Sequence, residues 1–191
     1  MERFPLVTPS NCNCHLSIVW NLLRVQELTG EEGGSFEVLL GLIERTQSDC
    51  TAVLRCDTCR QVRFSLVLIT LVSGILVEQL EACCNGIGLC QNSEPSTAAS
   101  SSGLKASLGD YELDDADSRL LARELIGLRM RQFSEVMVLL QNAITEVQSM
   151  NKSDDLLQDS KTGLVCLESI KVHGDRLSTL LQTLGSQNLN L

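Results

Sequence analysis

The stretch RFSLVLITLVSGILVEQLEACC, residues 63–84, decides the fold of this chain. Residues 64–77 include no charged side chain, and the first charges beyond them are Glu78 and Glu81. A membrane-spanning helix needs about 20 predominantly apolar residues, whereas a shorter run is more typical of a buried core helix. The length of the uncharged run therefore favours a helix that is apolar on all sides because other helices cover it.

The many β-branched residues of this stretch leave a buried pair of strands as an alternative. They are Val67, Ile69, Thr70, Val72, Ile75 and Val77. The run is longer than an ordinary strand, however, and only Ser73-Gly74 interrupts it as a turn signal. We therefore expect one central helix over residues 63–84, which emerges towards solvent at Glu78 and Glu81.

The composition indicates a soluble, all-α protein without an affinity of its own for nucleic acid. Of 191 residues, 43% are hydrophobic but only 3% aromatic, so Leu, Val and Ile must form the core. Three prolines and a Leu-rich composition favour helices. A net charge of −9 repels the phosphates of nucleic acid. Because the apolar run is short for a span, no membrane partner is expected either.

A low-complexity segment divides the sequence into two helical halves. Residues 1–11 form a leader with two prolines and without the apolar run of a signal peptide. Residues 12–91 form the N-terminal helical half, and residues 92–110 are rich in Ser and Ala, which predicts a disordered linker. The C-terminal helical half, 111–191, is expected to pack on the first half in a single composite domain.

Helical periodicity places further helices on both sides of this linker. We expect helices over residues 12–28, 35–46, 49–54, 114–149 and 164–184, a turn over 55–60 and a polar break over 151–159. Gly174 weakens the last helix. The apolar stripe of the long helix comprises Leu121, Leu125, Leu128, Val136, Leu140, Ile144 and Val147, widened by Phe133, Met137 and Leu139. It departs from a strict heptad, which favours a core role over dimerisation.

Two close cysteine pairs are the candidate metal ligands of the sequence. They are Cys12 with Cys14 and Cys56 with Cys59, and together they could supply four thiolates to zinc. A C-x-C pair is atypical, the neighbouring residues favour helix, and the chain is long enough to fold without metal. A redox C-x-x-C would need a βαβ context that is missing. We therefore favour free packing thiols in a reducing compartment and assign no metal ligand.

No catalytic constellation is present. The two histidines, His15 and His173, are interpreted as surface or hydrogen-bonded core residues, since nothing pairs either of them with a nucleophile. Glu44, Glu78 and Glu81 are interpreted as solvated polar positions. The sequence also lacks the phosphate-binding, dinucleotide-binding and nucleophile-elbow glycine motifs. We therefore expect a protein that is not an enzyme, without catalytic or cofactor-binding residues and without a cofactor.

The order of these motifs resembles a known family. Cys12-Asn13-Cys14-His15 opens a Leu-rich helix, a Phe-x-x-Leu-Leu segment follows at Phe36, and Val53-Leu54-Arg55-Cys56 brings a second close cysteine. The apolar helix, the Ser-rich linker and an Arg/Leu-rich long helix complete the order. Over residues 12–184, and best over 12–23, 54–84 and 120–140, it resembles the regulatory domain of aflatoxin-regulator-type fungal zinc-cluster transcription factors.

The resemblance implies a transcription-regulatory domain of a fungal secondary-metabolite gene-cluster regulator, in the nucleus or, for a fragment, in the cytoplasm. It implies partners from the transcription machinery or a co-regulator. The family's DNA-binding head, a zinc cluster of six cysteines, has no counterpart here, so DNA binding is expected only of a full-length family member. The alternatives are a stand-alone helical protein that dimerises through residues 114–149 and a small zinc-binding protein that uses Cys12, Cys14, Cys56 and Cys59.

Overall fold

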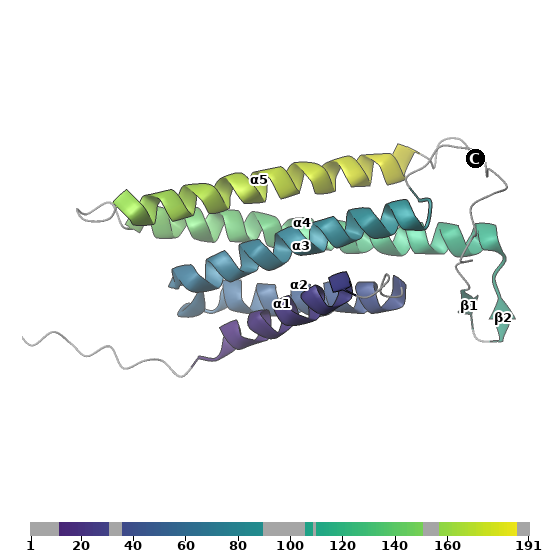
Figure 1. The fold of residues 1–191 in the computed structure, drawn as a ribbon, viewed down its shortest axis with the longest axis horizontal. Helices are drawn as coiled ribbons and strands as arrows, with labels where there is room; N and C mark the ends of the chain where they lie inside the picture. Colours follow the sequence, from purple (N-terminus) through teal and green to yellow (C-terminus); the bar gives the residue numbers. More distant parts are fainter. Residues whose placement is uncertain (1–11, 31–35, 90–105, 109, 151–156, 187–191) are drawn as a thin grey trace, which may run out of the picture.

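Helix α3, Arg63–Gly86, runs through the bundle and contacts each of the other four helices (Figure 1). The computed structural model describes residues 12–30, 36–89, 106–108, 110–150 and 157–186. In these ranges the elements are α1 (Cys14–Gly30), α2 (Phe36–Arg55), the 3-10 turn η1 (Cys59–Gln61), α3, β1 (Ser107–Leu108), β2 (Tyr111–Glu112), α4 (Asp115–Met150) and α5 (Leu157–Ser186). The all-α class predicted from the sequence is confirmed.

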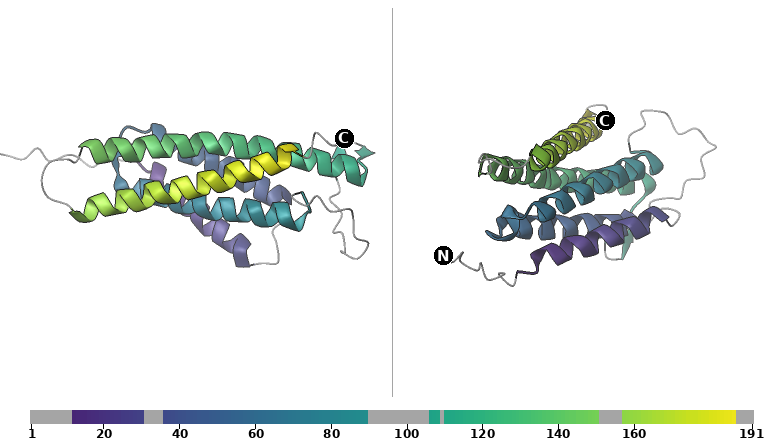
Figure 2. Two further views of the ribbon diagram at one scale, coloured as in Figure 1. Left: turned by 90° about the horizontal axis from the view of Figure 1, so that it is seen from above. Right: turned by 60° about the vertical axis from the view of Figure 1, so that its left-hand side comes forward.

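The helices form two layers that lie lengthwise along an elongated molecule. Helices α1, α3 and α5 lie side by side in one layer, and α2 and α4 lie behind them (Figures 1 and 2). The two halves of the chain meet where α2 and α3 contact α4 and where α3 contacts α5. These contacts build a shared core.

The central position of α3 is as expected from its apolar sequence. It is the one helix among the described residues that is long and apolar enough to cross a membrane, yet 56% of its most apolar window is buried inside the bundle. One narrow strip departs from the expectation of an all-round buried helix. Phe64 and Leu71 are 60% and 52% exposed and lie in line with the exposed Glu78, because positions seven residues apart share a helix face.

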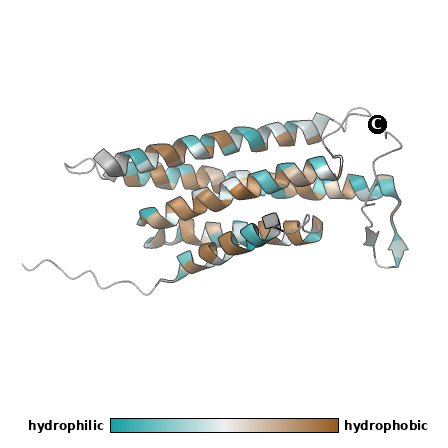
Figure 3. Ribbon diagram, viewed as in Figure 1, coloured by the Kyte–Doolittle hydropathy of each residue, from teal (hydrophilic) through white to brown (hydrophobic). Residues whose placement is uncertain are grey.

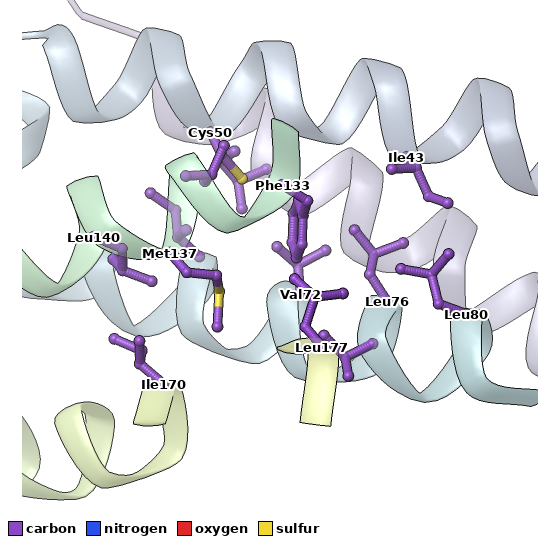
Figure 4. Close-up of a cluster of buried hydrophobic side chains, with 14 of the residues drawn as sticks. Ile43, Cys50, Val72, Leu76, Leu80, Phe133, Met137, Leu140, Ile170 and Leu177 are labelled. Carbon is purple, nitrogen blue, oxygen red and sulfur yellow. The ribbon is translucent and has the colours of Figure 1, made fainter. Parts of the chain in front are cut away.

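Side chains from all five helices fill the core. Phe133 of α4 is fully buried in one cluster with Val72 of α3, Leu177 of α5 and Ile43 of α2 (Figure 4). These apolar contacts join both layers and both halves of the chain. Burial of such side chains contributes roughly 1.5–3 kcal/mol each, so the core is the main stabilising element.

Helix α2 corrects the prediction of two shorter helices over 35–46 and 49–54. It is continuous because neither Gly nor Pro interrupts residues 47 and 48, and its buried face continues at helical spacing through Thr46, Cys50 and Val53. Asp49, at the start of the predicted second helix, lies within α2 and accepts a hydrogen bond from Asn21 Nδ2 of α1 at 2.8 Å.

Helix α4 confirms the long helix predicted over 114–149 but not its entire buried stripe. The N–H of Asp117 donates to Asp114 Oδ1 at 2.8 Å, so Asp114 caps the helix. Leu125 and Leu128 are 37% and 44% exposed, whereas Ile126 and Met130 are fully buried. Steps of four residues from the buried Ala122 lead to Ile126 and then to Met130, not to the leucines beside them.

Two further helix ends, the start of α5 and the end of α3, differ from the predictions. Helix α5 begins at Leu157, well before residue 164, and Gly174 does not interrupt it. Helix α3 ends at Gly86 rather than at residue 84, and the glycine beyond it with a positive φ is Gly88 (φ 68°). There the N–H of Leu89 donates to the Cys84 carbonyl at 2.9 Å, which closes the helix in a Schellman motif.

Three predicted segments lie wholly or partly outside the described residues. They are the leader over 1–11, residues 92–105 of the linker and residues 151–156 of the polar break. At the end of the predicted linker, Ser107 and Leu108 pair in antiparallel register with Glu112 and Tyr111. This small hairpin lies at the start of α4 (Figure 1).

Candidate metal centre

Four cysteine side chains meet at the end of the bundle where α1 begins, α2 ends and α3 begins. They belong to Cys12, Cys14, Cys56 and Cys59, which we call the thiol cluster, and their sulfur atoms all lie within 4.8 Å of one another. The two pairs come from distant segments of the chain and are brought together because α1 packs against both α2 and α3.

The sulfur of Cys12 lies against those of the other three. It is 2.9 Å from Cys14 Sγ, 3.4 Å from Cys56 Sγ and 3.3 Å from Cys59 Sγ. A tetrahedral metal ion with bonds of about 2.3 Å to four sulfurs would place those sulfurs roughly 3.8 Å apart. The three distances from Cys12 are shorter than that value by about 0.4 to 0.9 Å, so the other sulfurs would have to move away from Cys12 by this amount to complete a tetrahedron.

Backbone hydrogen bonds hold both pairs in place. Beyond the last residue of α2, the N–H of Arg60 donates to the Cys56 carbonyl at 3.0 Å, which closes a tight turn. The N–H of Val62 donates to the Cys59 carbonyl at 3.1 Å and leads the chain into α3. On the other segment, Ser17 Oγ donates to the carbonyl of Cys14 at 2.7 Å. The cluster is therefore built on helix ends and a turn with fixed geometry.

The thiols differ in exposure and in acidity. Cys59 is 2% exposed and the other three are half-buried. Cys12 and Cys14 share a hydrogen bond in which either sulfur can be the donor. This bond, with further ones from the Cys14 backbone and from Cys59 and Cys56, lowers the pKa of Cys12 to about 6. The bond to Cys12 raises the pKa of Cys14 to about 11, and burial raises that of Cys59 to about 12. Cys12 is thus more acidic than Cys14 and Cys59.

Three kinds of chemistry are open to such a cluster: metal binding, disulfide formation and simple packing. All eight cysteines that the structure describes are free thiols. Disulfide sulfurs lie about 2.05 Å apart and pair off, whereas these four converge on a single point. The amino-acid sequence alone favours packing thiols at these residues and predicts no metal ligand. It could not establish that the two pairs meet, because that depends on how α1 packs.

The two histidines are not members of the thiol cluster. His15 lies in the first turn of α1, and His173 is half-buried on α5 against α3. Burial, followed by the positive charge of Arg176, lowers the pKa of His173.

The glutamates interpreted as solvated positions take part in ion pairs between helices. Glu44 of α2 accepts a hydrogen bond from Arg129 Nη2 of α4 at 2.7 Å. Glu81 of α3 binds the guanidinium of Arg176 at two points, with Arg176 Nε donating to Glu81 Oε1 at 2.8 Å. Glu78 lies 3.7 Å from the same guanidinium. These ion pairs connect α2 with α4 and α3 with α5, and no sequence signal marks them.

Neither a family model, nor a curated protein, nor a solved structure matches this chain. The description of the protein therefore rests on its own fold and on its own side chains. They define an all-α bundle with a cluster of four thiols at one end.

Proposed function

We propose that this chain is a non-enzymatic regulatory domain that works through protein–protein contacts in fungal transcription control. The resemblance of its motif order to aflatoxin-regulator-type regulatory domains supports this function, and the all-α architecture is compatible with it. On that basis the domain belongs to a nuclear regulator of a secondary-metabolite gene cluster.

An exposed apolar row on α1 carries the proposal of protein contacts. Leu16, Trp20 and Leu23 are 47%, 66% and 46% exposed and follow one another at steps of four and three residues. Such residues lie on one helix face, while Ile18 and Val25 bury the opposite face. Figure 3 shows apolar residues in brown on α1, at the lower edge of the bundle.

A helix with this pattern is suited to a partner with an apolar groove. Trp is enriched among the residues that contribute most binding energy at interfaces, and helix-in-groove recognition uses anchors at this spacing. Trp20 is the only tryptophan of the chain. The net charge of −9 favours a basic protein partner over DNA.

A tethering experiment tests this function. The chain is fused to an unrelated DNA-binding domain in a fungal host, and transcription of a reporter with the matching site is measured. We expect reporter output to change when the chain is present. Trp20→Ala should abolish most of that change, because loss of a central anchor weakens binding by about 2 kcal/mol or more.

Val165→Ala is the matched control, since Val165 of α5 is 68% exposed, close to the exposure of Trp20. It should leave the reporter response unchanged, and circular dichroism should show both variants folded. A fusion without any effect on the reporter would contradict the regulatory function. Equal effects of the two substitutions would contradict the role of the α1 row.

Dimerisation is a second candidate because α4 exposes several leucines near its start. Leu120, Leu125 and Leu128 are 43%, 37% and 44% exposed. Farther along α4, predicted stripe members such as Leu140 and Ile144 are buried in the bundle and cannot serve a partner, whereas Leu139 is 38% exposed. Sedimentation equilibrium at micromolar concentration tests this candidate, and a monomer would count against it.

A further inference from the structure

We infer that the thiol cluster binds one Zn²⁺ ion as a closed structural site. This inference is independent of the regulatory function proposed above, because it concerns how the fold is held together at one end. It also departs from the expectation, drawn from the sequence, that these cysteines are packing thiols.

The arrangement of the sulfurs is the first argument. Packing thiols are expected to be dispersed through the core, as Cys50 of α2 and Cys166 of α5 are. The thiol cluster instead collects two close pairs from separate segments, with every sulfur within 4.8 Å of the others. Two close pairs of soft ligands with tetrahedral reach are the usual composition of a structural zinc site.

The identity of the metal follows from the ligand type and from the separations. Four thiolates in a tetrahedron are typical of zinc or of iron–sulfur centres. Clusters with several irons spread their cysteine ligands around a larger body, whereas these sulfurs all lie within 4.8 Å of one another, which suits a single ion. Zn²⁺ is therefore the metal that we assign.

The number of ligands defines the role of the ion. Catalytic zinc sites keep one position for water or substrate, whereas structural sites fill all four with protein ligands. The thiol cluster supplies all four. When the ion binds, four Zn–S bonds form, the hydration water leaves, and each protonated thiol releases its proton to solvent.

The bound ion would fasten α1 to the rest of the bundle. The segment with Cys12 and Cys14 leads into α1, while Cys56 and Cys59 belong to the turn between α2 and α3. Crosslinking the two segments closes the chain from Cys14 to Cys56 into a loop and fixes the start of α1. Three of the sulfurs are half-buried, so the ion can enter from solvent.

Metal analysis of the full chain, purified under reducing conditions without chelator, tests the assignment directly. We expect one zinc per chain. X-ray absorption at the zinc edge should show four sulfur neighbours at about 2.3 Å. Zinc below a small fraction of the chain concentration, iron in its place, or nitrogen and oxygen neighbours would each overturn the inference.

A substitution pair locates the ion. Cys56→Ser should lose the bound zinc, whereas Cys83→Ser should keep it, because Cys83 is also half-buried but lies outside the cluster. Equal zinc contents in the two variants would overturn the assignment to the cluster.

Should Cys56→Ser fail to fold, the unsubstituted chain gives the same information through thiol alkylation followed by peptide mass spectrometry. The four cluster cysteines should resist alkylation until a chelator is added, while Cys83 should react equally before and after. Equal reaction of the cluster cysteines in both states would overturn the inference. The tethering experiment and the metal analysis use different readouts, so either proposal can fail without the other.

Discussion

His173 is a residue whose surroundings favour its uncharged form in the folded protein. Its ring packs against α3 at Gly74, and burial is the main cause of its lowered pKa. Arg176 on the same helix lowers the pKa further, while Glu78 and Glu81 of α3 raise it and offset part of this effect. Around pH 6 the folded chain therefore binds fewer protons at this site than the unfolded chain.

This difference predicts a pH dependence of stability. An unfolded histidine titrates near pH 6.5, so as the pH falls below about 6.5 the unfolded state gains a proton first and the free energy of unfolding decreases. His173→Gln removes the titrating group. Urea denaturation of both proteins should show the wild type losing stability relative to His173→Gln between about pH 7.5 and pH 5. A difference that stays constant over this range would contradict the prediction.

At the scale of single residues, the sequence shows which side chains could bind a metal or form an ion pair. It does not show which of them lie close together in space. The C-x-C and C-x-x-C pairs are visible in the sequence, yet only the packing of α1 brings Cys12 within 3.4 Å of Cys56. Similarly, Glu81 and Arg176 pair across 95 positions of sequence. Contacts of this kind depend on the relative position of whole helices, which local patterns do not contain.

At the scale of elements, two helix glycines have opposite roles. A Cβ built at Gly74 of α3 would lie 2.6 Å from His173 Nε2, whereas a Cβ at Gly174 of α5 would meet nothing within 4 Å. Gly74 therefore allows α3 and α5 to approach closely. Gly174 only lowers helix propensity and packs against nothing that requires its small size.

Alanine substitutions should separate these roles. Gly174→Ala should raise the free energy of unfolding by about 0.5–1 kcal/mol, because alanine is the better helix former. Gly74→Ala should lower it, since a clash in a packed interface costs about 1–3 kcal/mol and exceeds the same helical gain. Chemical denaturation with urea measures both changes.

The double variant Gly74→Ala with His173→Ala serves as the control, because it removes the ring that the new methyl group would meet. In that background Gly74→Ala should stabilise the protein by an amount similar to Gly174→Ala. A Gly74→Ala variant as stable as Gly174→Ala in the wild-type background would show that the close approach of α3 and α5 does not need glycine.

Element positions were predictable where a long pattern ended in clear signals. Helix α4 has an acidic first turn and a sustained apolar stripe, and α1 ends at Gly30, two residues beyond the predicted end. The division of α2 into two helices was wrong because Ser48 and Asp49 are residue types that often begin a helix. In the structure Asp49 lies within α2 and accepts a hydrogen bond from Asn21 of α1.

At the scale of the whole molecule, α3 organises the bundle by contacting every other helix. The sequence predicts this central position, because a helix without a polar face must be covered. It does not predict the two-layer order, in which α1 and α5 flank α3 while α2 and α4 lie behind (Figure 1). That order depends on the mutual fit of all the helices, for example at Phe133 and Gly74.

The same central helix leads to the last prediction, which concerns membranes. The uncharged run over residues 64–77 is shorter than the roughly 20 residues that a span needs. Glu78 and Glu81 follow it, and Ser65 and Ser73 lie buried among the other helices. The other helices of the bundle cover the apolar surface of α3, so that no lipid is needed to shield it from water. Synthesised in the presence of lipid vesicles, the chain should remain in the supernatant after alkaline extraction.

A variant with Glu78→Leu and Glu81→Leu provides the positive control for this experiment. It extends the uncharged run from residues 64–77 to residues 64–93, of which 64–84 are predominantly apolar and long enough to span a bilayer, and should shift a measurable share of the chain into the extracted vesicle pellet. Recovery of the wild type in the pellet at the level of this variant would contradict the central, buried role of α3. The wild type and this variant differ only at Glu78 and Glu81, the first charges after the apolar run. A difference between supernatant and pellet therefore depends on these two positions.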